Sequence, residues 1–267
     1  MFEFLVFQGA DIAQVMRLMA AGIEVQGADG EFLRFIENRP RRPAEYDEFR
    51  RIALHLQWLN DHRQLFARSL VFEETLVADY PGVPRAEDIN NGFNLGLRWR
   101  QKPNGHYELT RLTVGRVVVT NVDPMALTDA QRFELNEKVR RNPSDFVYVD
   151  IRPDGPGGEL AFQGALKLRS LYQILTFVAR GITNEPEHDV TPDPRTGEIG
   201  LNPRSALQIN VTDSVPDNRS PFIRFHGQCY CVNDTHWDRI SFTLLNVLFQ
   251  TSVGAVEGVG IPITITK

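Results

Sequence analysis

PFIRFHGQCYCVNDTHWDRISFTLLNVLFQTSV, residues 221–253, joins a predicted hairpin to the most apolar helix that the sequence predicts. Two runs of aromatic, β-branched and thiol side chains flank His226-Gly227, and a two-residue linker with glycine second is typical of a primed turn. That turn sets the register of the hairpin through two facing pairs, Phe225 with Gln228 and Ile223 with Tyr230. We therefore expect an antiparallel hairpin here.

The helix after this hairpin is predicted to be buried on most of its circumference. Thr235 and Asp238 have the spacing of a capping box, which satisfies free backbone amides at a helix start. Most later positions are apolar, and the polar ones form a single stripe on one helical face, at Arg239, Thr243, Asn246 and Gln250. Each large side chain that the helix buries contributes roughly 1.5–3 kcal/mol, so we expect it to dominate the stability of its domain.

Composition indicates a globular protein that does not bind nucleic acid. The 267 residues are 42% hydrophobic and 24% charged, with a net charge of -5, whereas nucleic-acid binders usually carry a basic face. No run reaches the roughly 18–20 apolar residues of a membrane helix, and the opening MFEFLVFQG lacks the features of a secretory signal. We expect a cytoplasmic protein, or one of the cell envelope (periplasm or outer membrane) whose sequence begins after its signal.

The two cysteines, Cys229 and Cys231, lie on the same face of one predicted strand. Such neighbours do not readily form a disulfide with each other, and no second Cys/His pair lies nearby to complete a zinc site. We expect two buried free thiols and no metal or cofactor.

Patterns along the chain predict an α+β fold with a mixed, mainly antiparallel sheet. Residues 1–68 read as helical, with a helix from Asp11 to a glycine cap at Gly22, a helical patch at 32–36 and a long helix at 46–68. Residues 69–152 read as a β-rich hairpin region with one helix, at 129–141, and with a loop at 80–92. Residues 153–267 read as an α+β domain of strand-helix-strand-strand-helix order, with a helix from Ser170 to Gly181 and a last edge strand at 261–266.

Protein interfaces are the best-supported use of the surface. Trp99 alternates with Arg98 and Arg100 on the predicted hairpin, and tryptophan with arginine is the composition enriched in interfaces. The long loop 183–205, which contains His188 and Asp189, is predicted to be a contact arm between subunits. These five residues are the interface candidates.

Two segments, LRSLYQILTFVARGI at 168–182 and FIRFHGQCYCVNDTHWDRISFTLLNVLFQ at 222–250, resemble an uncharacterised family of bacterial envelope proteins. That family combines an RSL-type helix, a YRG-type hairpin, an acidic turn and a Ser-x-x-Phe-x-Leu-Leu helix, and its members often begin with a lipoprotein signal. The matching residues are Arg169-Ser170-Leu171, Gly227, Asp234, Phe242, Leu244 and Leu245. The chain differs at Phe225-His226, where the family has Tyr-Arg, and at Arg239, where it has Ser. The resemblance implies an envelope protein, possible membrane association through a lipidated N-terminus, and no known activity.

These observations predict a non-enzymatic structural or assembly component of a bacterial cell-envelope complex. We expect it to form a homo-oligomer or a larger assembly through its sheet edges, the Trp99 hairpin and the 183–205 loop. One alternative is a hydrolase whose acid-base groups come from distant residues, namely His55, His188, Asp189 and Asp213. Another alternative is a small-ligand binding module built around a closed apolar pocket.

Overall fold

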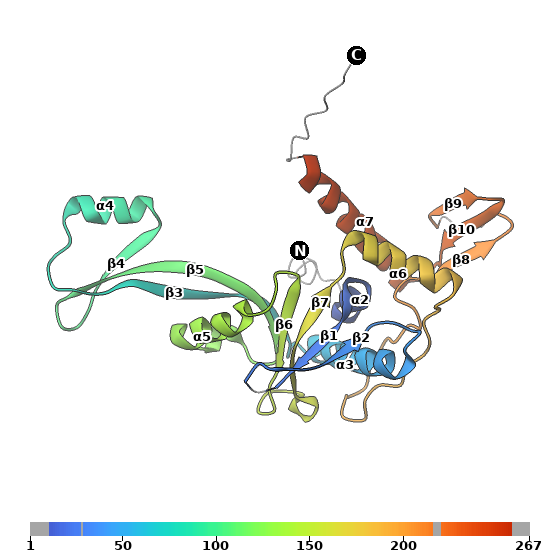
Figure 1. Ribbon diagram of the computed structural model, residues 1–267, viewed down its shortest axis with the longest axis horizontal. Coiled ribbons are helices and arrows are strands. Elements are labelled where there is room, and N and C mark those ends of the chain that lie inside the picture. The colour runs from blue at the N-terminus through green and yellow to red at the C-terminus, as the bar shows by residue number, and fades with distance from the viewer. Residues whose placement is uncertain (1–10, 28, 216–219, 258–267) are drawn as a thin grey trace, which may run out of the picture.

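A seven-stranded mixed sheet is the centre of the computed structural model, which describes residues 11–27, 29–215 and 220–257 (Figure 1). Its order is β2 (Phe32–Glu37), β1 (Ala20–Gln26), β7 (Phe162–Leu168), β6 (Phe146–Ile151), β5 (Tyr107–Thr120) and β3 (Phe66–Tyr80), and β4 (Leu97–Gln101) also pairs with β5. All pairings are antiparallel except β5 with β6. The predicted α+β class is confirmed, and the sheet takes strands from each of the three predicted segments.

Helices cover both faces of this sheet. Helices α2 (Ile12–Met19) and α3 (Pro43–Asp61) contribute to the main hydrophobic core, which contains Val149 and Leu166 from the sheet. Helix α5 (Asp129–Arg140) packs on the opposite face, where Leu135 and Val139 meet Tyr148. Because side chains alternate across a strand, neighbouring positions of β6 serve the two cores in turn. Two short 3₁₀ helices, Pro124–Ala126 and Gly158–Leu160, lie in the connections.

Three predictions for the first quarter of the chain are wrong. The patch 32–36 is part of strand β2 and not a helix, because β1 pairs with it and supplies hydrogen bonds that a short helix would lack. Gly22 lies inside β1 and not at a helix C-cap. A Cβ atom there would lie 2.3 Å from the carbonyl oxygen of Ile36, so glycine allows the close approach of the two strands. The long helix stops at Asp61, short of the predicted residue 68, and the chain turns at Arg63, which has a φ of 58°.

The predicted hairpin and its turn are confirmed. Strands β9 (Phe222–Phe225) and β10 (Gln228–Val232) pair with Phe225 opposite Gln228 and Ile223 opposite Tyr230. His226 and Gly227 both have positive φ, 49° and 82°, as a type I′ turn requires. Strand β8 (Ile209–Thr212) completes a separate three-stranded sheet of order β8-β10-β9, in which Cys229 and Cys231 are buried free thiols.

Helix α7 (His236–Glu257) begins at the predicted cap, where the Asp238 amide donates to Thr235 Oγ1 over 3.1 Å. The predicted polar stripe is exposed. The prediction of burial around most of the helix is wrong, because α7 packs on the body through one side only. Leu244 and Leu248 join the main core, whereas Phe242 is 36% exposed and Phe249 is 51% exposed.

The C-terminal third has the order strand, helix, three strands, helix, which matches the predicted strand-helix-strand-strand-helix order only when the hairpin is counted together with the strand before it, and its strands belong to two sheets. Strand β7 lies in the central sheet, α6 (Leu171–Thr183) continues two residues past the predicted end at Gly181, and the later strands form the small sheet. The predicted strand 261–266 lies outside the described residues. Within the described ranges, no helix has the length and apolar character needed to cross a membrane.

Candidate interaction surfaces

A long β-sheet arm, residues 73–114, extends from the body (Figure 1). β3 has 15 residues, which corresponds to a length of about 50 Å, and only its first half lies over the core. β5 contacts β6 only through residues 118–120, so in the arm it pairs with β3 and β4 alone. The arm is therefore a narrow ribbon that ends in a region where the structure has helix α4 (Ala86–Asn94) in place of the predicted loop 80–92.

The arm buries almost no apolar surface of its own. Between Phe72 and Val118, every residue of which is described, no Leu, Ile, Val, Phe, Trp or Tyr side chain is buried. The apolar side chains at its end are instead exposed, and we call this set the arm tip: Val83 is 75% exposed, Ile89 45%, Phe93 81% and Leu95 73%. Ile89 and Phe93 are four residues apart and lie on one face of α4. An isolated ribbon with its apolar side chains in water is marginally stable, so this surface is suited to a partner.

Trp99 holds α4 against the arm. Its indole Nε1 donates to the carbonyl oxygen of Asp88 over 3.3 Å, and its ring lies 5.3 Å from that of Tyr80. The indole also lies close to the buried Gly92, where a Cβ atom would lie 3.4 Å from Trp99 Nε1. The role of Trp99 visible in the structure is thus within the chain, and the arm tip that it positions carries the exposed apolar surface.

The two arginines beside Trp99 are both exposed. Arg100 pairs with Glu73 across the arm, and its Nη1 lies 3.8 Å from Glu108 Oε1. The carbonyl oxygen of Arg98 accepts from the Thr110 hydroxyl over 3.4 Å, in the register that pairs these two residues. Both guanidinium groups remain on the solvent side of the arm.

A second apolar surface lies at the other end of the molecule, around the small sheet. Strand β9 is an edge strand, and Ile223 is 64% and Phe225 59% exposed. Together with α6, β8 and α7, this strand surrounds a hollow of about 440 Å³, which we call the apolar groove; its walls include Ile182, Ile209, Phe222, Ile223, Phe225 and Phe242. An unprotected apolar edge strand beside a groove is a typical site for another chain.

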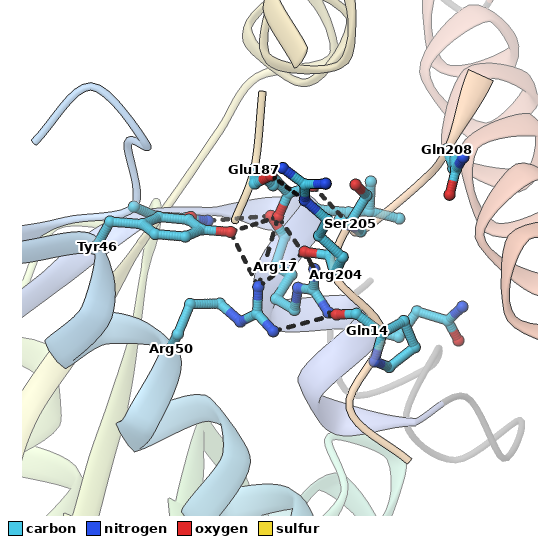
Figure 2. Close-up of polar contacts among 12 residues, drawn as sticks. Gln14, Arg17, Tyr46, Arg50, Glu187, Arg204, Ser205 and Gln208 are labelled. Carbon is cyan, nitrogen blue, oxygen red and sulfur yellow. Dashed lines mark hydrogen bonds and ion pairs between the residues drawn. The ribbon is translucent and has the colours of Figure 1, made fainter. Parts of the chain in front are cut away.

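The segment that leads to the small sheet is anchored by a buried carboxylate, Glu187 (Figure 2). Glu187 Oε2 accepts from Arg17 Nη2 over 3.1 Å and from the Tyr46 hydroxyl over 2.7 Å, and Oε1 accepts from the Ala206 amide over 2.6 Å. Arg50 Nη1 donates to the Tyr46 hydroxyl over 3.0 Å and lies 3.9 Å from Glu187. We call these residues the Glu187 anchor; it joins α2 and α3 to both ends of the segment 187–206.

The anchor continues from α2 into α7. Gln14 Nε2 donates to the Trp237 carbonyl oxygen over 2.7 Å and to Ser241 Oγ over 2.6 Å. Trp237 Nε1 in turn donates to the carbonyl oxygens of Ser205 and Ala206, over 3.0 and 3.1 Å. A continuous polar network therefore positions α7, and with it one wall of the apolar groove, relative to the body.

Electrostatics keep Glu187 ionised although it is buried. Burial alone would raise the pKa of this carboxyl, but the charge of Arg17, the hydrogen bonds from Tyr46 and Ala206 and the charge of Arg50 outweigh it, so its pKa lies below the ordinary value of 4.5. Burial also lowers the pKa of Arg50. The guanidinium carbon of Arg169 lies 3.8 Å from the centre of the Phe177 ring. Burial lowers the pKa of Arg169 to about 10. These groups stabilise one arrangement of the chain.

The loop 183–205 packs along α3 of its own chain, and its role as a contact arm between subunits stays a prediction. Arg51 donates to the Thr191 carbonyl oxygen and Gln57 to that of Leu201. His188, half-buried, lies 2.7 Å from Asp47 Oδ1 and stacks 4.8 Å from the Tyr46 ring, and the neighbouring Asp189 side chain is exposed. The structure places these two candidates on the body, apart from Arg98, Trp99 and Arg100 on the arm (Figure 1).

The acid-base residues of the hydrolase alternative have separate partners. His55 is buried, with Nδ1 3.1 Å from Thr196 Oγ1 and Nε2 2.9 Å from the Gly157 carbonyl oxygen. Asp213 is exposed beyond the end of β8. Among the hydrogen bonds of the described residues, none joins any two of His55, His188, Asp189 and Asp213.

A polar hollow of about 670 Å³ lies between α5 and the sheet. Its floor contains the buried Asp150, which accepts from Arg152 Nε and from Gln163 Nε2, each over 3.0 Å. Lys138 Nζ donates to Gln163 Oε1 over 3.0 Å. The charged side chains around the hollow, acidic and basic, are Asp29, Glu134, Glu137, Lys138, Arg141, Asp150, Arg152 and Asp154. Its polar floor is satisfied from within the chain.

No protein-family model matches the chain, and no curated protein or solved structure matches it either. The arm tip and the apolar groove are therefore the structural features that bear on how the chain interacts with other proteins. Sequence reasoning missed the arm tip, although Ile89 and Phe93 at helical spacing, with the acidic residues Glu87 and Asp88 in the first turn, were a detectable helix signal.

Proposed function

We propose that this protein is a non-enzymatic structural component that assembles with other protein chains in a bacterial cell-envelope complex. The observation that carries the proposal is the arm, in which about 25 Å of strand β3 extends beyond the core and which ends in a helix with Phe93 81% exposed. Exposing large apolar side chains at the end of a long extension is unfavourable in water, and a partner that covers them would remove that penalty.

The design of the body supports the same proposal. The Glu187 anchor joins α2, α3 and α7 through buried ion pairs and hydrogen bonds, and such networks favour one rigid arrangement of the elements. Rigid elements present an interaction surface without the entropy loss of ordering it on binding. The hydrolase alternative is less well supported, because His55 and His188 each bond to other groups.

The location in the cell envelope rests on the family resemblance of residues 168–182 and 222–250 and not on the surfaces. A lipidated N-terminus would associate such a protein with a membrane. The two parts of the proposal can therefore be tested separately, by cell fractionation for location and by mass for assembly.

The test of assembly is native mass spectrometry of the protein purified under mild detergent conditions from its source, with chemical cross-linking of the same extract. We expect masses above that of a single 30.4 kDa chain and cross-links from the arm, for example from Lys102. A single species at the mass of one chain, with no inter-chain cross-link, would contradict the proposal.

A further inference from the structure

We infer that the arm tip of one copy of this chain docks in the apolar groove of a second copy, which produces a head-to-tail assembly. This inference rests on the proposed function and deepens it by naming the partner. It joins the two unpartnered apolar surfaces described above, one convex and carried on a helix, the other concave.

The sizes of the two surfaces match. The exposed fractions of the four tip side chains correspond to on the order of 500 Å² of apolar area, and Phe222, Ile223, Phe225 and Phe242 expose a similar area at the groove. Each is at the upper end of the roughly 300–600 Å² that the largest patch on a monomer reaches. Together they would bury about 1,000 Å², which is the lower limit for a specific interface and is typical of a weak, reversible contact.

The shapes fit the helix-in-groove mode of recognition. Ile89 and Phe93, four residues apart on α4, are the kind of anchors that an amphipathic helix inserts into an apolar groove. The groove of about 440 Å³ has room for more than one such side chain. A symmetric contact between the arm tips of two copies would, in contrast, leave the apolar groove of each copy uncovered.

The charges of the two surfaces are complementary. Helix α4 carries Glu87 and Asp88 in its first turn and no basic residue. Strand β9, which borders the groove, carries one charged residue, the exposed Arg224. Opposite charges at the rim guide the approach of the surfaces and set their register.

A tip cannot dock in the groove of its own molecule, because α4 and the small sheet lie at opposite ends (Figure 1), so the contact that we infer joins two copies. The contact joins two different surfaces, so an open chain of copies retains a free tip at one end and a free groove at the other. Such heterologous contacts produce rings when the rotation closes and filaments when it does not.

The test mixes two single variants, Phe93→Asp in the tip and Ile223→Asp in the groove. Wild-type protein is expected to form concentration-dependent oligomers in sedimentation velocity, and each variant alone to associate at least tenfold more weakly. An equal mixture of the two is expected to form one-to-one dimers and nothing larger, because it contains one intact groove and one intact tip. Phe32→Asp is the matched control, since Phe32 is 60% exposed on β2, outside both surfaces, and it should assemble like wild type.

Circular dichroism and the unfolding midpoint establish that each variant is folded. A second measurement uses Phe93→Cys mixed with Ile223→Cys, which should form a disulfide-linked dimer on mild oxidation; Cys229 and Cys231 are buried and do not compete. No dimer in either mixture overturns the inference. If Phe93→Asp enters the native complex as wild type does, the inference fails while the proposed function stands; if the wild type is a monomer in its source extract, the proposed function fails as well.

Discussion

Replacing Glu187 with glutamine tests whether the buried anchor holds the C-terminal elements on the body. The substitution keeps the size of the side chain and removes its charge. In the native protein the Glu187 carboxylate accepts hydrogen bonds from Arg17, which is 1% exposed, and from the Tyr46 hydroxyl. It also lies within ion-pair distance of the fully buried Arg50. In Glu187→Gln both cations remain buried, and the new amide NH₂ faces groups that are themselves donors.

The size of the effect follows from this geometry. Removing one partner of a buried ion pair typically destabilises a protein by about 3–5 kcal/mol, because the remaining charge is left without compensation. Arg17 also donates to the carbonyl oxygens of Pro203 and Arg204, both over 2.9 Å, and these bonds survive the substitution. We therefore expect a loss near the lower limit, about 3 kcal/mol. That is a large part of the roughly 5–15 kcal/mol by which ordinary domains are stable.

Urea unfolding followed by circular dichroism measures this loss, and hydrogen exchange locates it. The amides of α7 are expected to exchange faster in Glu187→Gln, whereas those of β6 and β7 in the central sheet change less. The control is Glu48→Gln, which breaks the exposed pair with Arg34 and should change the unfolding free energy by less than about 1 kcal/mol. A Glu187→Gln variant within about 1 kcal/mol of wild type, with unchanged exchange in α7, would refute the role assigned to the anchor.

Three further outcomes are expected. Because the folded pKa of Glu187 is below 4.5, the stabilisation that its charge provides is complete above about pH 4.5 and is lost as the pH falls through the folded pKa. The difference in unfolding free energy between wild type and Glu187→Gln should therefore be constant at neutral pH and shrink in acid. A difference that is independent of pH down to pH 2 would contradict this. Trp99→Ala should release α4 from the arm, so limited proteolysis should cut residues 81–96 faster while the unfolding free energy of the body stays within about 0.5 kcal/mol of wild type; protection equal to wild type would count against the contact. His226→Asn should stabilise the small sheet by up to about 1 kcal/mol in urea unfolding, since asparagine tolerates the φ of 49° better than histidine; a loss of stability would show that the His226 ring, 4.1 Å from Phe225, matters more than the turn.

Local signals in the sequence were sufficient wherever neighbouring residues decide the structure. The His226-Gly227 turn fixes its hairpin register through backbone conformation, and Ser170 with Gln173 starts α6 through a capping box. Patterns of the same kind predicted α5 and the two buried thiols. They failed at residues 32–36, where strand partners 6 to 13 positions away override a helical pattern.

The candidate surfaces depended on tertiary structure to a greater degree. Sequence reasoning identified Trp99 as important, but the structure uses it to hold α4, and the exposed face belongs to Ile89 and Phe93. Glu187 stood in a loop rich in proline, aspartate and glycine with no sign of burial, because its partners Arg17 and Tyr46 lie 170 and 141 positions away.

The sequence by itself determined the α+β class, the starts of α5, α6 and α7 and the hairpin that precedes α7, because turns, caps and side-chain periodicity are local properties of the chain. Only the tertiary structure decided that one apolar helix face is half uncovered, that a long loop is pinned by a buried carboxylate, and that β3 and β5 extend into an arm. Whether a residue is exposed depends on what packs against it. A pattern of apolar side chains in the sequence is the same whether residues of its own chain or of another chain cover them, so the pattern does not distinguish the two cases.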